Sequence, residues 1–256
     1  MTIAFARRKR AGGRWRDGLV WLAAWLALAA IVLLALGPVG WHAGWWHFRT
    51  AFFYLMPAAA YCGLAAMAMA GVAILFGRRS IRGWSIAVAG FAFVIGAAIA
   101  YVPWHYNQLR GTVPPIHDIT TDTTDPPRFI AVLPLRANAR NSTDYGGPSV
   151  AAQQRAAYPA IVPFDSKLSP GDAFKRALDV ANAMGWDIVA ALPAEGRIEA
   201  TDTTLLFGFK DDIVIRVTPS AEGSRVDIRS ESRIGGSDIG KNASRIARFL
   251  DKMRGA

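Results

Sequence analysis

The first half of the chain contains three long apolar runs without a formal charge. They lie between Asp17 and Arg49, between Arg49 and Arg78, and between Arg82 and Arg110, and they are 31, 28 and 27 residues long. A helix that crosses a bilayer needs about 20 such residues. A cleaved signal peptide would have a shorter apolar stretch of about 7–15 residues, so the first run is interpreted as retained. The pattern predicts three transmembrane helices, at about 18–37, 52–76 and 84–104.

The second half shows patterns typical of strands and of amphipathic helices. Four extended runs with short, turn-like connections predict an antiparallel meander, with strands at 186–192, 197–207, 213–218 and 224–234. Helices are expected at about 148–158, at 170–184 after a Ser169 cap, and at 238–253. We therefore expect a membrane-anchored α+β protein in which two main helices pack on one face of a four-stranded sheet.

The last of these strands alternates sharply between apolar and charged residues. Val226, Ile228 and Ile234 point one way, and the side chains on the other face are charged: Arg225, Asp227, Arg229, Glu231 and Arg233. Arg216 on the preceding strand can join them. A sheet with one solvated, charged face is the simpler interpretation. The alternative is a surface that recognises an anionic ligand or a protein.

The distribution of charge bears on the class of protein. A net charge of +10 would suggest a nucleic-acid binder if it were spread over a folded surface. Residues 1–106, however, hold ten basic residues and one acidic residue, while residues 107–256 are nearly balanced. The basic excess thus indicates membrane topology, and we expect no nucleic-acid partner.

Orientation follows from the loops, because cytoplasmic loops accumulate Lys and Arg. Six basic residues precede the first run and three separate the second from the third, whereas the loop 38–50 has only Arg49. We therefore expect a cytoplasmic N-terminus in a bacterial inner membrane, and a periplasmic domain after about Tyr106. The predicted parts are a basic tail (1–17), a transmembrane region (18–106), an extended lead-in rich in Pro, Thr and Asp (107–127), and a periplasmic α+β domain (128–256).

Small residues follow one face of the third predicted helix, at Ala92, Gly96 and Ala100. This stripe fits either packing within a three-helix bundle or dimerisation. The oligomeric state therefore stays open. The three spans contain no Asp, Glu, Lys or Arg, which argues against a transporter or a pump.

Three separated strings resemble one family. They are PPIHDITTDTTDPPRF at 114–129, the pair Asp211-Asp212 leading into IVIRV, and VDIRSESRIGGSDIGKNASRI at 226–246. Together they are similar to the bacterial and plastid family called domain of unknown function 1499 (DUF1499), over about residues 112–252. The resemblance implies an exported or membrane-anchored α+β domain, with similar apolar helices in several bacterial members. It implies no activity and no catalytic residue.

Acidic residues and one histidine crowd the lead-in, at His117, Asp118, Asp122 and Asp125. Such a group could hold a divalent cation or supply a general base, and local turn hydrogen bonds are the alternative. Combined with residues of the strands, it gives these catalytic candidates: His117, Asp118, Asp212, Arg216 and Arg229. The spacing matches no established metal loop, so we expect neither a metal nor another cofactor.

The string GGSDIGKN at 235–242 resembles a phosphate-binding P-loop. Asn242 stands where a magnesium-binding Ser or Thr is required, and the preceding strand is antiparallel. We therefore favour a turn in which Asp238 caps the last helix. The alternative is a simple anion at the helix N-terminus, with these ligand candidates: Arg229, Arg233, Gly236, Asp238 and Asn242.

The sequence thus predicts an inner-membrane-anchored periplasmic module with a non-enzymatic binding or envelope-structural role. Its expected partners are the lipid bilayer and an envelope protein or anionic ligand. The alternative is an enzyme, or a metal- or anion-binding domain, that uses the lead-in and the strand residues. That alternative needs His117 or Asp118 beside Arg216 or Arg229 in a pocket, whereas a simple tether would run away from the sheet.

Overall fold

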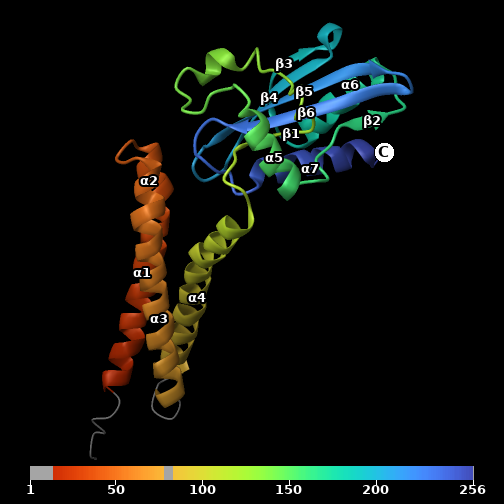
Figure 1. Cartoon of the computed structure of the whole chain (residues 1–256). Coiled ribbons are helices and arrows are strands. Elements are labelled where there is room, and N and C mark those ends of the chain that lie inside the picture. Colours follow the sequence, from red (N-terminus) through yellow and green to blue (C-terminus); the bar gives the residue numbers. More distant parts are fainter. Residues whose placement is uncertain (1–13, 78–82, 256) are drawn as a thin grey trace, which may run out of the picture. The chain divides into compact units, whose positions relative to one another are not determined.

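The computed structural model describes residues 14–77 and 83–255, and it divides the chain into two compact units, residues 1–108 and 109–256 (Figure 1). The first unit consists of long apolar helices. The second contains an antiparallel sheet with helices.

Helices form at all three predicted places in the first unit. They are α1 (Arg14–His42), α3 (Met56–Gly77), which is preceded without a break by the short α2 (Phe48–Thr50) and the π-helical turn η1 (Ala51–Leu55), and α4 (Gly83–Thr112). All three are long and apolar enough to cross a membrane. Helices α1 and α4 extend beyond their predicted bounds, and so does α3 when the continuous α2 and η1 are counted with it. Helix α4 includes residues 107–112, which we expected to be extended.

Small residues lie where these helices touch. The buried side chains of α1, α3 and α4 are mostly alanines, whereas large apolar side chains such as Trp25, Tyr61 and Phe91 are exposed. A Cβ atom at Gly96 would clash with the carbonyl oxygen of Gly63 on α3, so only glycine permits this approach. The small-residue stripe of α4 is therefore used, at Gly96, inside the bundle.

The sheet of the second unit has six strands, not the four that we expected. The predicted meander is present as β3 (Asp187–Leu192), β4 (Arg197–Thr203), β5 (Lys210–Ser220) and β6 (Gly223–Ser232). Two further strands, β1 (Asp118–Thr120) and β2 (Phe164–Ser166), pair with the outer edge of β6. Each has only three residues, which is too short for a hydrophobic pattern to reveal.

The edges and turns of this sheet are closed by specific residues. The side chain of Gln154, on α5 (Gly147–Ala157), accepts from the amide of Thr120 at 3.0 Å and donates to its carbonyl at 2.6 Å, which protects the free edge of β1. Gly196 follows the turn η3 (Pro193–Glu195) with a positive φ of 61°, where a Cβ atom would meet the carbonyl oxygen of Val217.

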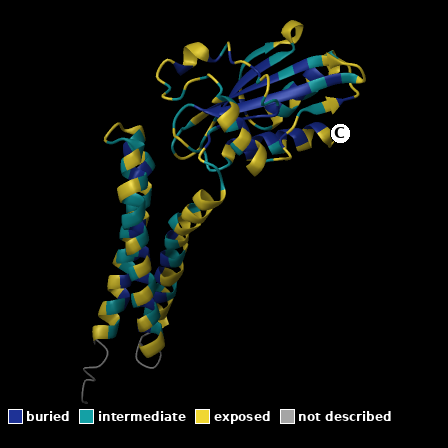
Figure 2. Ribbon diagram, viewed as in Figure 1, coloured by how far each residue is buried: buried dark blue, intermediate teal, exposed yellow. Residues whose placement is uncertain are grey.

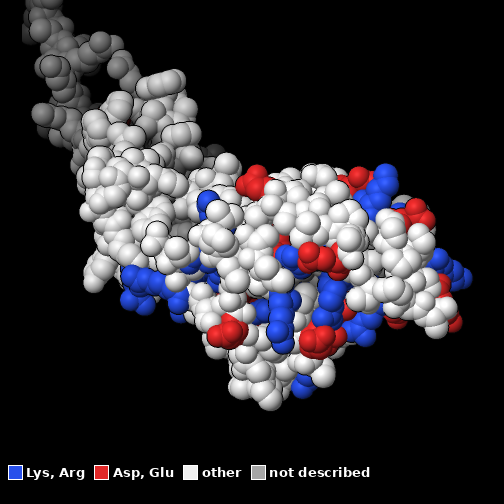
Figure 3. All heavy atoms as spheres, turned by 90° about the horizontal axis from the view of Figure 1, so that it is seen from above, with Lys and Arg blue, Asp and Glu red and all other residues white. Residues whose placement is uncertain are grey.

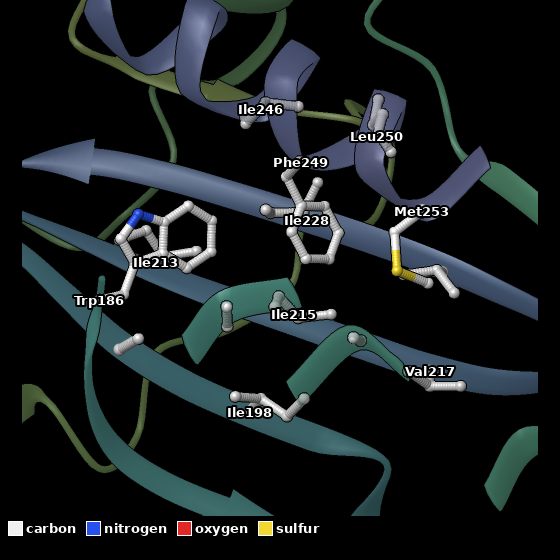
Figure 4. Packing of buried hydrophobic residues seen from close by; sticks show 14 of the residues in the cluster. Trp186, Ile198, Ile213, Ile215, Val217, Ile228, Ile246, Phe249, Leu250 and Met253 are labelled. Atoms are coloured by element: carbon white, nitrogen blue, oxygen red, sulfur yellow. The ribbon is translucent and has the colours of Figure 1, made fainter. Parts of the chain in front are cut away.

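One face of the sheet is covered by the two predicted main helices, α6 (Pro170–Ala183) and α7 (Lys241–Arg254). Ser169 caps α6 as expected, because its side chain accepts from the amide of Asp172. Figure 4 shows the apolar side chains of α7 directed at the isoleucines of β5 and β6, and Trp186 stacks on Phe249 with 5.8 Å between the ring centres. This face holds the hydrophobic core.

Candidate functional site

The second face of the sheet carries the charged side chains, and most of them are buried. Asp212, Glu231 and Glu199 have no exposed side-chain surface, and Asp227 and Arg229 are nearly as deep. Residues 121–146, which we call the covering segment, lie over this face and include the 3-10 turn η2 (Leu133–Arg136). Our expectation of a solvated charged face was wrong. The alternation located the charged residues, but it could not show that the covering segment shields them from solvent (Figure 2).

Apolar contacts attach the covering segment at its centre. Phe129 and Val132 pack on Val214, the one apolar residue among the charged positions of β5. The guanidinium of Arg229 lies over the Phe129 ring, 4.9 Å from its centre. This arrangement is a cation–π contact that is shielded from water.

Glu199 of β4 binds the backbone of the covering segment. Its carboxylate accepts hydrogen bonds from the amides of Ile130, Ala131 and Val132 at 2.9–3.1 Å, and it forms an ion pair with Arg197. Three consecutive amides that converge on one carboxylate act like the first turn of a helix toward an anion. Glu199 is therefore a structural anchor for the cover.

Arg229 of β6 holds the lead-in. It donates to both oxygens of Asp118, at 2.9 and 2.7 Å, and to the carbonyls of Pro127 and Thr143, at 3.3 and 2.8 Å. Asp118 and Arg229 thus lie side by side, and the lead-in joins the sheet instead of running away from it. The same contacts engage all three nitrogens of the guanidinium within the fold.

Asp212 of β5 is the centre of a second ionic group. It accepts from Arg136 of the covering segment at 2.6 Å, from Arg233 at 2.8 Å, and from the hydroxyl of Thr201 at 2.7 Å. Burial by itself would raise the pKa of Asp212, but the hydrogen bonds from Arg233, Thr201 and Arg136 outweigh it and lower the pKa. Asp212 is therefore held as a carboxylate.

Glu231 is paired with Asp118 across the two strands, and its pKa is shifted in the opposite direction to that of Asp212. Burial, followed by the charge of Asp118, raises its pKa to about 8, although Arg136 donates to it at 3.1 Å. Its Oε2 atom is buried without a hydrogen-bond partner among the described residues, and Arg229 lies 3.8 Å away. Two acidic groups and too few donors at this position favour a protonated Glu231.

A third ionic group lies farther along the charged face, where Arg216 and Arg225 bind the start of the covering segment. Arg216 donates to Asp125 at 2.8 Å and to Asp122 at 3.3 Å, and both arginines pair with Asp227. Burial of Asp122 raises its pKa, whereas the amides of Asp125 and Thr124 and the two arginines lower it, with a net decrease. Asp122 and Asp125 are thus engaged by arginine and backbone groups.

A recess of about 260 Å³ opens beside the Asp118–Arg229 pair. It is lined by the start of β1, the end of the covering segment and the loop after β6: Pro115, Ile116, His117, Asp118, Ser142, Asp144, Gly146, Val150 and Gly236. The Nδ1 atom of His117 is buried and has no hydrogen-bond partner in the part of the chain that the structure describes. The hydroxyl of neighbouring Tyr145 is also buried, with no partner among residues 14–77 and 83–255. Burial, then the charge of Asp118, raises the pKa of Tyr145 to about 12.

The loop 235–242 next to the recess does not form a phosphate cradle. The carboxylate of Asp238 accepts from the amides of Gly240, at 2.9 Å, and Asn242, at 2.5 Å, just where α7 begins. Burial raises the pKa of Asp238 although these amides lower it. Asp238 thus binds an amide of the first turn of α7, as a capping side chain would, but the N-cap position is Gly240 and α7 starts at Lys241, three residues later than expected.

The second unit matches a known family of proteins. The model of a "protein of unknown function (DUF1499)" matches residues 118–253, from the first residue of β1 to the last turn of α7. The chain belongs to the DUF1499 family. No curated protein matches it in a sequence comparison.

The DUF1499 domain brings some of the predicted site residues together and separates others. His117, Asp118 and Gly236 line the recess, and Arg229 lies directly behind Asp118. Asp212, Arg216 and Arg233 lie elsewhere on the charged face, each bound to partners. Asn242 is fully hydrogen-bonded, to Ser230, Ser232, Arg245 and the carbonyl of His117. Among the described residues no three His, Cys, Asp or Glu side chains form a group that could hold a metal ion.

Three buried charged residues of the DUF1499 domain were not identified from the sequence: Arg136, Glu199 and Arg245. Arg245 of α7 lies in the helix-side layer, where it donates to Asp202 and Asp211 at 2.6 Å. Its spacing from Asn242 and Phe249 places it on the buried face of α7, so helical periodicity could have found it. No comparable signal marks Arg136, because it follows an irregular segment.

Proposed function

We propose that this chain is a membrane-anchored binding module of the bacterial envelope. Helices α1, α3 and α4 span the inner membrane, and the DUF1499 domain lies in the periplasm. There the recess beside Asp118 binds a small polar ligand without converting it chemically. The recess carries the proposal, because it is a space of ligand size lined in part by His117, whose buried Nδ1 atom has no hydrogen-bond partner among the described residues.

Membrane insertion is supported by the surface of the helices. Their outward side chains are large and apolar, for example Trp21, Leu75 and Val94, while their contacts use small residues. A surface of this kind is stable in lipid but not in water. The orientation is supported by the basic residues of the N-terminal tail and of the loop 78–82.

Binding is favoured over catalysis by the state of the candidate groups. The carboxylate of Asp212 and the guanidinium groups of Arg216 and Arg229 are engaged by ion pairs that hold β1 and the covering segment in place. A group that is fixed by structural partners is poorly placed to exchange a proton or bind a reacting atom. Two aspartates and no Lys or Arg line the recess, so a neutral or cationic ligand fits it better than an anion.

The topology is tested with reporters fused after Tyr106 in cells. Alkaline phosphatase, which is active only in the periplasm, should be active there, and a reporter that works only in the cytoplasm should be silent. The reverse pattern would exclude a periplasmic domain. A fusion in the loop 38–50 serves as a periplasmic control, and one in the loop 78–82 as a cytoplasmic control.

The recess is tested by thermal unfolding of the detergent-solubilised full chain. Ethanolamine and putrescine are the cationic probes, and inorganic phosphate is the anionic one. A ligand that binds only the folded state raises the melting temperature. We expect an increase with an amine, a smaller one in the Asp144→Asn and His117→Ala variants, and none with phosphate. An increase with phosphate alone, or with neither probe class, would contradict the proposal.

A further inference from the structure

The loop between β4 and β5 exposes two leucines. Leu205 is 95% exposed, more than any other large apolar residue that the structure describes, and Leu206 is 65% exposed. Exposed apolar side chains at the tip of a hairpin lower the solubility of a protein unless another surface covers them.

The loop has a defined structure. The amide of Thr204 donates to the carbonyl of Phe209 at 2.8 Å, and the amide of Gly208 donates back to Thr204 at 2.9 Å. The rings of Phe207 and Phe209 stack with 5.3 Å between their centres. Leu205 is therefore presented by a closed turn, which lowers the entropy cost of inserting it into another phase.

The register of the sheet places this loop at one particular end of the domain. Pairing across the strands connects that end step by step: Thr203 with Lys210, Asp211 with Ser232, and Glu231 with Asp118. The leucine loop and the first residue of β1 therefore lie at the same end of the sheet. The turns at 193–196 and 221–222 lie at the opposite end.

The chain enters the domain at that same end. Helix α4 ends at Thr112 and β1 begins at Asp118, so only five residues connect them, and these span at most about 18 Å. The inference rests on the proposed function: if α4 spans the membrane, this end of the sheet is tethered close to the bilayer surface.

Basic side chains accompany the leucines. Lys210 and Arg140 are exposed, and both are connected to Arg233 by backbone hydrogen bonds. The amide of Arg140 donates to the carbonyl of Arg233, and the amide of Arg233 donates to the carbonyl of Lys210. Exposed Lys241 begins α7 after the same end of β6. Exposed apolar tips flanked by cations are typical of surfaces that contact anionic lipids. In the view of Figure 3, by contrast, Lys and Arg are interleaved with Asp and Glu over much of the domain.

We propose that the β4–β5 loop is a second membrane contact of this protein. Leu205 and Leu206 insert into the boundary between headgroups and acyl chains of the outer leaflet of the inner membrane, and Lys210 and Arg140 meet lipid phosphates. The DUF1499 domain is thereby held in one orientation on the bilayer instead of rotating about its connection to α4.

The test uses the full chain in vesicles of phosphatidylcholine and phosphatidylglycerol that contain nitroxide-labelled acyl chains. Cys62, the single cysteine, is replaced by Ala, and an environment-sensitive fluorophore is attached at Leu205→Cys. The matched control is Ala194→Cys, an exposed position in the turn at the opposite end of the sheet. A third label at Leu64→Cys, on an exposed face of α3, reports insertion of the helices themselves.

We expect strong quenching at 64, and quenching at 205 that is severalfold stronger than at 194. The charge-reversal pair Lys210→Glu and Arg140→Glu should reduce quenching at 205 and leave it unchanged at 64. Equal quenching at 205 and 194, with 64 quenched, would overturn this inference and leave the proposed function intact. Absence of quenching at 64 would instead contradict membrane insertion. The fluorophore at 205 could instead shift its emission without being quenched, by an amount that depends on the protein density in the vesicles. That result would show that the loop contacts a second copy of the chain, and it would also overturn the inference.

Discussion

Arg229 and Asp118 form a buried, two-point ion pair that joins the last strand of the domain to the first. The two residues are 111 positions apart in the sequence, and the donated hydrogen bonds are 2.9 and 2.7 Å long. Because Asp118 directly follows the connection from α4, this pair makes the lead-in a part of the folded domain. The same ion pair therefore stabilises the domain and fixes the point at which the domain is connected to the apolar helices.

The first prediction concerns the boundary of the folded unit. A polypeptide of residues 110–256 should unfold cooperatively, because it retains β1, the covering segment and the whole core. Trp186, its single tryptophan, is buried against Phe249 and reports the transition by fluorescence. A polypeptide of residues 128–256 lacks Asp118 and β1 and should be clearly less stable. Equal stability of the two would show that β1 is dispensable.

The second prediction is that Arg229→Ala strongly destabilises this 110–256 domain. The substitution leaves Asp118 buried without its cation, which costs about 3–5 kcal/mol in other proteins. Lys175→Ala is the matched control, because it breaks an exposed pair with Asp179 and should cost less than about 0.5 kcal/mol. Urea unfolding measures both, and similar costs for the two variants would refute the structural role of Arg229.

The third prediction concerns pH. The pKa of Glu231 is raised to about 8 from its ordinary value of 4.5, so the native state keeps a proton that the unfolded chain releases. This contribution is complete below about pH 4.5 and is lost as the pH rises to about 8. Between pH 5 and pH 8 the free energy of unfolding of the unaltered domain should therefore decrease relative to that of Glu231→Gln, which has no proton to lose. The difference in favour of the variant should be largest at pH 8 and should shrink toward pH 5.

Free energies of unfolding at pH 5, 6, 7 and 8 measure this margin. Glu195→Gln is the control, because Glu195 is exposed and pairs only at the surface with Arg197. Its pH profile should run parallel to that of the unaltered domain. If Glu231→Gln also runs parallel, Glu231 is ionised in the folded protein and the raised pKa is wrong.

The fourth prediction concerns the loop 235–242. Asp238→Ala should destabilise the domain by about 0.5–2 kcal/mol, the usual cost of a lost helix cap, because it frees the amides of Gly240 and Asn242. Lys241→Ala should be nearly silent, since a cation at the positive end of a helix adds little stability. Phosphate should leave the melting temperature unchanged. A rise with phosphate that disappears in Lys241→Ala would restore the anion-binding interpretation.

The sequence by itself determined the features that depend on local pattern. Uncharged runs longer than a bilayer is thick specify the three apolar helices, and period-two alternation specifies the strands of the meander. Ser169 and Asp238 were identifiable as capping residues because a cap acts within a few positions of its helix. Three separated strings of residues were enough to indicate the DUF1499 family, which the match to residues 118–253 confirms.

Only the tertiary structure decided the fate of the charged face. Alternation shows that Arg229 and Glu231 share a face, but it carries no information on what covers that face. The cover comes from an irregular segment with no periodicity, held by Glu199 and Arg136 through contacts across 67 to 95 positions. The recess at His117 arises in the same way, from three segments far apart in the chain. Burial and pairing are properties of the assembled layers, so a buried ionic network and a solvated charged strand look alike in sequence.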